Sequence, residues 1–220
     1  MQYKIVGTSH VAKESQTLIK EAFLEYKPQI IAVELDRHRL QGLLTKQKQK
    51  LGLSAIRQFG IGGFLFALIG KIMQEKIGKH LGVRPGEEFL YAIKLAKQND
   101  LKVALIDQDI NITLRNLKKV PFKEKFKIVI DSIRKKELRK IDLTKVPQEE
   151  LLEELIGWMK TRYPMLYKVL VDDRNKYMAS QIRAISLQHN QKVLAIVGAG
   201  HKKGMLEELN KMQADQITKL

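Results

Sequence analysis

The segment 192–201, KVLAIVGAGH, indicates the fold class of this 220-residue chain. After Lys192 it runs through five consecutive aliphatic residues, which is typical of a strand buried on both faces of a parallel sheet. The segments 3–10 (YKIVGTSH), 29–36 (QIIAVELD) and 101–109 (LKVALIDQD) repeat this pattern, and apolar residues at helical spacing separate them. Strands that alternate with helices predict an α/β fold with a mainly parallel central sheet flanked by helices.

We expect one domain over residues 1–220, in which mainly helical segments at about 38–95 and 112–190 form a helical insertion. The longest apolar stretch, 59–73, contains Lys71 and is shorter than the roughly 20 residues that a membrane-spanning helix needs. The first residues lack the charged and apolar regions of a signal peptide. These features predict a cytoplasmic protein.

The composition excludes some kinds of site. The chain has no cysteine, which rules out disulfides, thiolate metal ligands and a thiol nucleophile. Its net charge is +16, and much of the excess lies in segment 115–145. A basic surface favours anionic partners. However, this segment has few aromatic residues and no recognition-helix pattern, so we disfavour nucleic acid and expect a solvated helical face. Contact of this segment with a membrane surface, in a membrane-associated protein, stays open as an alternative.

Polar residues follow each predicted strand, at the edge where ligands bind in parallel sheets. These residues are Gly7, Thr8, Ser9 and His10 after the first strand, Glu34, Asp36 and Arg37 after the second, Asp107 and Asp109 after the third, and Gly198, Gly200 and His201 after the fourth. They include two of the five histidines and several carboxylates. We therefore expect the functional site at this edge.

Two of these turns share the form Gly-x-x-His, namely GTSH at 7–10 and GAGH at 198–201. Glycine permits a sharp turn and a close approach of backbone N–H groups to a ligand. A purely structural turn with an incidental histidine is the alternative. A dinucleotide-binding loop is disfavoured, because the residues after Gly204 form one predicted helix with no further strand.

The carboxylates near these turns have structural as well as chemical interpretations. Glu34 and Asp36 could form ion pairs at a strand end, Asp107 or Asp109 could cap a helix, and Asp173 could suit a helix N-terminus. A set of histidines and carboxylates also suits Zn²⁺, Mn²⁺ or Co²⁺. Such an ion would lower the pKa of a bound water, and a neighbouring carboxylate could take the proton. The sequence has neither H-E-x-x-H nor G-x-S-x-G.

The chain resembles the TraB, or pheromone-shutdown, family over nearly its whole length. The resemblance rests on six segments in order: GTSHVAKES (7–15), VELDRHR (33–39), RPGEEFLYAIKLA (84–96), LIDQDINITLR (105–115), DDRNKYMA (172–179) and IVGAGHKKGM (196–205). This family is similar to the Tiki proteases, the erythromycin-esterase-like enzymes and the ChaN-like proteins. The pheromone-shutdown proteins carry a membrane-spanning region after this domain, so the chain is either a soluble member or part of a longer protein.

The resemblance implies a divalent-metal-dependent hydrolase that acts on peptides. It implies that His10 and His201 hold Mn²⁺, Co²⁺ or Zn²⁺ with help from Glu34, Asp107 or Asp173. Glu34 is then the expected general base, and Arg37 or Arg174 orients substrate or stabilises an oxyanion. We expect Gly7, Thr8, Ser9, Gly198, Gly200, Asp36 and Asp109 to contact the ligand.

Two alternatives stay open beside the hydrolase. The pheromone-shutdown members imply a protein that sequesters a peptide or small ligand without chemistry. The net charge allows a nucleic-acid binder, which ranks below both. The resemblance is also compatible with a homodimer, because related folds complete their sites by pairing.

Overall fold

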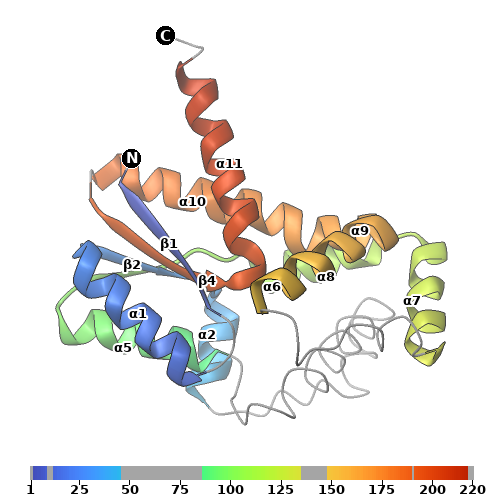
Figure 1. The fold of residues 1–220 in the computed structure, drawn as a ribbon, viewed down its shortest axis with the longest axis horizontal. Coiled ribbons are helices and arrows are strands. Elements are labelled where there is room, and N and C mark those ends of the chain that lie inside the picture. Colours follow the sequence, from blue (N-terminus) through green and yellow to red (C-terminus); the bar gives the residue numbers. More distant parts are fainter. Residues whose placement is uncertain (1, 9–11, 46–85, 135–147, 190, 218–220) are drawn as a thin grey trace.

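The computed structural model describes residues 2–8, 12–45, 86–134, 148–189 and 191–217. In this part of the chain a four-stranded parallel sheet has the order β1-β4-β2-β3 (Figure 1). The strands are β1 Tyr3–Thr8, β2 Ile30–Val33, β3 Lys102–Leu105 and β4 Val193–Gly198. The predicted α/β fold with a mainly parallel sheet is confirmed.

Helices cover both faces of this sheet, as Figure 1 shows. Helices α1 (Ala12–Tyr26) and α5 (Glu87–Gln98) pack against one face, and α10 (Asp173–His189) and α11 (Ala199–Ile217) pack against the other. Alternate residues of β4 serve the two layers: Leu194 and Ile196 face α1 and α5, whereas Ala195 faces α10 and α11. This explains why the strands are continuous aliphatic runs.

Further helices complete the described part of the fold. These are α2 Arg37–Leu44, α6 Ile110–Lys118, α7 Phe122–Arg134, α8 Gln148–Arg162, α9 Pro164–Tyr167 and the π-helix η2 Lys168–Asp172, which continues into α10. A third apolar cluster joins α6, α7, α9 and η2 around Leu117 and Leu166. Most of the segment predicted as helical at 38–95 lies outside the described residues.

The segment GAGH differs from its prediction. Strand β4 ends at Gly198 and α11 begins at Ala199, so His201 lies in the first turn of a helix and not in a sharp turn. Among the described residues Gly86 is the one glycine with a positive φ, so neither Gly198 nor Gly200 needs the left-handed conformation. Gly200 lies beside α8, and a Cβ there would stand 3.4 Å from Ile156, an ordinary contact distance.

The registers bring the carboxyl ends of the strands to one edge. Thr8 of β1 pairs with Gly198 of β4, and Val33 of β2 pairs with Ile196 of β4 and with Leu105 of β3. Side chains that follow these strands therefore meet where α10 and α11 also begin. In the described ranges no helix is both long and apolar enough to span a membrane; the apolar stretch 59–73 lies outside them.

Candidate functional site

Arg174, in the first turn of α10, binds two carboxylates that come from two different strand ends. Its Nε and Nη2 atoms donate to the two oxygens of Asp107 at 2.9 and 2.8 Å. Nη2 also donates to Oε1 of Glu34, which follows β2. All three side chains are largely buried. Burial lowers the pKa of Arg174, but the charges of Glu34 and Asp107 outweigh this and raise it above its ordinary value.

His201 joins this group as a neutral imidazole. Its Nε2 lies 3.1 Å from Nη1 of Arg174, and because a guanidinium can only donate, Nε2 is the acceptor. Nδ1 therefore carries the proton and donates to Oδ1 of Asn175 at 2.7 Å. Burial lowers the pKa of His201, which favours this uncharged form. The result is one defined tautomer whose unprotonated nitrogen lies beside Glu34 and Arg174.

Glu34 is held as an ionised group. Its Oε2 accepts a hydrogen bond of 2.7 Å from the backbone N–H of Gly198, and its Oε1 lies 3.5 Å from Nε2 of His201. Burial alone would raise the pKa of Glu34. The positive charges of His201 when protonated, Arg174 and Arg39, with the Gly198 N–H, lower it to about 2. A carboxylate of this kind is well suited to fix a cation and poorly suited to take a proton near neutral pH.

Arg39, in the first turn of α2, completes what we call the Arg174 cluster: Glu34, Arg39, Asp107, Arg174 and His201. Its Nη1 donates to Oδ2 of Asp107 at 2.6 Å. With His201 neutral, two carboxylates face two guanidinium groups, and the formal charges of the cluster sum to zero. Buried charges of this sort cost desolvation energy, so they are a poor source of stability and a common feature of functional sites.

Four of the predicted site residues are thus brought together, namely Glu34, Asp107, Arg174 and His201. Gly198 contacts the cluster through its N–H. Thr8 is buried nearby in β1, and its hydroxyl donates to the carbonyl of Val197 at 3.2 Å. Gly7 packs against α11, since a Cβ there would stand 3.1 Å from Ala199 Cα. His10 and Ser9 lie outside the described residues.

Other predicted residues have structural roles. Oδ1 of Asp36 caps α2, accepting from the N–H groups of His38 and Arg39, while its buried Oδ2 has no hydrogen-bond partner among the described residues. Asp109 caps α6 through the N–H of Asn111. Asp173 pairs with Lys168, one turn away on the same helical segment, and not with the Arg174 cluster.

Arg37 is exposed at the start of α2, whereas Arg39, which was not among the predicted site residues, contacts Asp107. Asp36 as a helix cap is the signal that could have identified Arg39, because the cap fixes where α2 begins and therefore which arginine faces Asp107. Asn175 is the second residue that sequence reasoning missed. It is buried and follows Arg174 directly, but an asparagine inside a helical pattern carries no specific signal.

Two atoms of a kind that a divalent ion accepts lie close together, the neutral Nε2 of His201 and the ionised Oε1 of Glu34. Their separation of 3.5 Å is close to the roughly 3.3 Å expected for two tetrahedral ligands of one ion. Arg174 now bonds to both atoms. Within the described ranges no three histidine, aspartate or glutamate side chains form a metal-binding group.

Comparison with known proteins agrees with the order of motifs along the chain. The TraB/PrgY/gumN family matches residues 3–218. An uncharacterised protein of Methanocaldococcus jannaschii is 34% identical over 215 residues, which cover 95% of this chain and 53% of that protein. A human TraB domain-containing protein is 25% identical over 228 residues, covering 91% of this chain and 61% of that protein. The bovine TraB domain-containing protein is 25% identical over the same length.

This chain spans a little over half the length of the curated relatives it matches. The family match nevertheless extends over nearly all of it and includes every described residue of the Arg174 cluster. The chain belongs to the TraB/PrgY/gumN family.

Proposed function

We propose that this chain is a divalent-metal-dependent hydrolase that acts on peptides, with its site at the carboxyl edge of the sheet. The observation that carries the proposal is the convergence of Nε2 of His201 and Oε1 of Glu34 at 3.5 Å, beside a buried arginine. The resemblance of the two Gly-x-x-His segments to those of Tiki-type metalloproteases also supports it. His10, in the first of these segments, is the proposed third ligand.

The described residues would have distinct roles. His201 and Glu34 would hold the ion, because His201 presents its unprotonated Nε2 and because the charges of the nearby arginines keep the pKa of Glu34 below its ordinary value. A bound Zn²⁺, Mn²⁺ or Co²⁺ would supply an activated water and polarise a carbonyl. Asp107 would position Arg174 through two hydrogen bonds. Arg174, freed from its contact with the ligand atoms, would stabilise negative charge on the substrate.

One observation favours the alternative, a protein that sequesters a peptide or small ligand. Arg174 already satisfies both proposed ligand atoms, and the cluster is neutral without any ion. A stable neutral cluster of this kind could bind a ligand without turning it over. Chemistry on the bound peptide therefore distinguishes the two functions.

Peptide cleavage tests the proposal. The protein would be stripped with a chelator, given Mn²⁺, Co²⁺ or Zn²⁺ in turn, and incubated with a mixture of synthetic peptides analysed by mass spectrometry. We expect cleavage that requires metal, is lost in His201→Ala and Glu34→Gln, and survives in Lys203→Gln, an exposed residue paired with Glu153. Recovery of intact peptide with every metal, from a protein that retains it through gel filtration, would contradict hydrolysis and support sequestration.

A further inference from the structure

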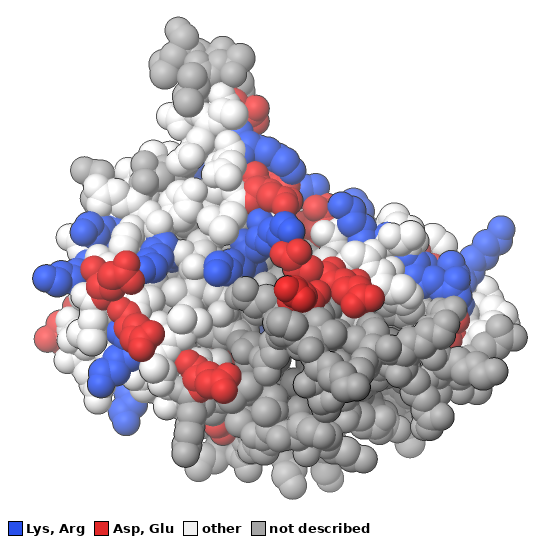
Figure 2. Space-filling model, viewed as in Figure 1, with Lys and Arg blue, Asp and Glu red and all other residues white. Residues whose placement is uncertain are grey.

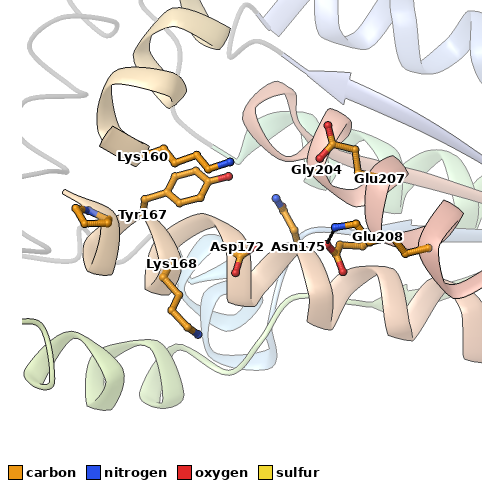
Figure 3. Close-up of a pocket in the computed structure, with 10 residues that line it drawn as sticks. Lys160, Tyr167, Lys168, Asp172, Asn175, Gly204, Glu207 and Glu208 are labelled. Carbon is orange, nitrogen blue, oxygen red and sulfur yellow. Dashed lines mark hydrogen bonds and ion pairs between the residues drawn. The ribbon is translucent and has the colours of Figure 1, made fainter. Parts of the chain in front are cut away.

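A pocket of about 420 Å³ adjoins the Arg174 cluster but is lined by other side chains (Figure 3). Its walls come from the end of α8, from α9 and η2, and from α10 and α11. The residues that matter below are Lys160, Tyr167, Asp172, Asn175, Gly204 and Glu207. The volume falls in the range of roughly 300–1,000 Å³ that is common for small-molecule sites.

Asn175 separates this pocket from the cluster. Its Oδ1 accepts the proton of His201, and its amide nitrogen Nδ2 lies against Gly204, where a Cβ would stand only 2.2 Å away. Figure 3 shows that nitrogen directed into the pocket. No described residue accepts a hydrogen bond from Nδ2, so it is a donor available to a ligand.

Two further donors lie on one side of the pocket. The ammonium of Lys160 stands 5.8 Å from the centre of the Tyr167 ring, so a cation–π contact holds the two together. Burial, together with the negative charges of Asp172 and Glu207, raises the pKa of Tyr167 above its ordinary value, and the phenol remains a donor. In Figure 3 the ends of both side chains point toward the same part of the pocket as Asn175.

The opposite side of the pocket carries acids from α11. Glu208 pairs with Lys211, and Asp172 pairs with Lys176. Glu207 has no ion pair within the described part of the chain, and neither has Lys160. The pocket therefore presents one unpaired cation beside two neutral donors, and one unpaired anion across from them.

We propose that this pocket binds a small zwitterion with the charge pattern of an amino acid. A carboxylate would accept from Lys160, Tyr167 and Nδ2 of Asn175, and an ammonium would pair with Glu207. The π-helix η2, which places Asp172 in the wall, is a further reason, because π-helical turns are rare and frequently lie at functional sites. The inference does not depend on hydrolysis, since a free amino acid offers the same chemistry as a short peptide.

Direct binding measurements test this inference. Isothermal titration calorimetry would use the full chain with L-alanine, L-leucine, L-alanyl-L-alanine and tri-L-alanine, and with two blocked probes, N-acetyl-L-alanine and L-alanine amide. Free amino acids and peptides are separate arms, so preference for one class identifies the source of the zwitterion. Because Asn175 also holds His201, we expect the bound probe to shift the Nδ1 resonance of His201 in ¹⁵N NMR spectra.

The variants Lys160→Gln and Glu207→Gln remove the two unpaired charges, and Lys203→Gln is the matched control outside the pocket. We expect each pocket variant, and each blocked probe, to weaken binding by about tenfold, as for the loss of one charge-assisted hydrogen bond. All three are changes on exposed side chains, and circular dichroism checks the fold. Absence of binding at about 10 mM for all four zwitterions would overturn the proposal. Blocked probes that bind as tightly as free ones, or pocket variants that behave like the control, would overturn it as well.

Discussion

Oδ1 of Asn175 lies 2.7 Å from Nδ1 of His201, and this contact decides which ring nitrogen faces the carboxylates. Since Nδ1 donates to Asn175, Nε2 keeps its lone pair, 3.5 Å from Glu34. Most metal-binding histidines are oriented by such a hydrogen bond from the second ring nitrogen. Asn175 is therefore a positioning residue for the site, although no sequence motif marks it.

Replacing Asn175 by alanine should leave the Nδ1–H of His201 buried without an acceptor. We expect the free energy of unfolding to fall by about 1–3 kcal/mol, the range for an unsatisfied buried donor. Urea denaturation followed by circular dichroism measures this. The ¹⁵N spectrum of wild-type His201 should show the Nδ1–H tautomer, and a predominant Nε2–H form would contradict the hydrogen-bond assignment.

A side chain added at Gly204 should destabilise the fold. A Cβ there would come within 2.2 Å of Nδ2 of Asn175, so Gly204→Ala must displace Asn175 and weaken its bond to His201. We expect a loss of about 1–3 kcal/mol in unfolding free energy, as for overpacking in a core. Gly157→Ala in α8 is the matched control: no atom lies within 4 Å of its added Cβ, and helix propensity predicts a gain of up to about 1 kcal/mol. Equal effects of the two substitutions would refute the steric argument.

The stability of the metal-free protein should depend on the protonation of His201. Burial lowers the pKa of His201 below its ordinary value of 6.5, so below that pH the unfolded chain binds a proton that the folded protein does not. This contribution to the unfolding free energy is present above pH 6.5 and is lost as the pH falls. His201→Gln removes it, so we expect a shallower loss of stability for the variant than for wild type.

Glu34 contributes in the same direction at lower pH. Burial alone would raise the pKa of Glu34, but His201 when protonated, Arg174 and Arg39 lower it to about 2. The contribution of Glu34 to the unfolding free energy is therefore present above its ordinary pKa of 4.5 and is lost between pH 4.5 and about 2. The contribution of His201 can be measured separately, because the range from about pH 8 to pH 5 lies above the range in which Glu34 titrates. Urea denaturation of wild type and His201→Gln, both in a chelator, would be compared over that range. Parallel curves for wild type and His201→Gln in that range would show that His201 titrates normally in the folded state.

Arg39 and Arg37 should behave differently although they are two residues apart. Arg39→Ala removes the 2.6 Å bond to Asp107, and we expect it to cost about 1.5–3 kcal/mol, as for a hydrogen bond to a charged group. Arg37 is exposed, so Arg37→Ala should change the unfolding free energy by less than about 0.5 kcal/mol. Thermal and urea unfolding of the two variants compare them, and a larger loss for Arg37→Ala would contradict the placement of Arg39 in the cluster.

The fold and half of the site were predictable from the sequence for clear physical reasons. Aliphatic runs such as 193–197 identify buried parallel strands, and parallel strands bring their carboxyl ends to one edge. This rule placed Glu34, Asp107 and His201 together before any contact was known. The sequence pattern did not locate the start of the last helix. Because α11 begins at Ala199, the residues of GAGH after Gly198 are helical and do not form a turn.

Helix capping explains why some predicted ligand-binding carboxylates lie outside the Arg174 cluster. Asp36 and Asp109 satisfy helix N-termini, which a carboxylate before a helix does as readily as it binds a ligand. Asp173 lies next to Arg174 in sequence, but successive helical residues point in different directions, so its side chain pairs with Lys168. The sequence shows residue types and approximate spacing, whereas the phase of each helix decides which neighbour enters the site.

Basic and acidic side chains are mixed on one face of the described part of the molecule (Figure 2). The net charge is +16, but on the face shown in Figure 2 the described Lys and Arg side chains lie beside Asp and Glu and form no continuous basic band. Ion pairs among the described residues include Lys203 with Glu153 and Lys4 with Glu25.

The metal content of the protein tests the central claim most directly. Wild type, His10→Ala/His201→Ala and the control His38→Ala, whose side chain is exposed, would be dialysed against a mixture of Mn²⁺, Co²⁺ and Zn²⁺ and then against buffer. Elemental analysis should find about one ion per chain in wild type and control, and almost none in the double variant. Equal metal content in wild type and a folded double variant would contradict the assignment of His10 and His201 as ligands.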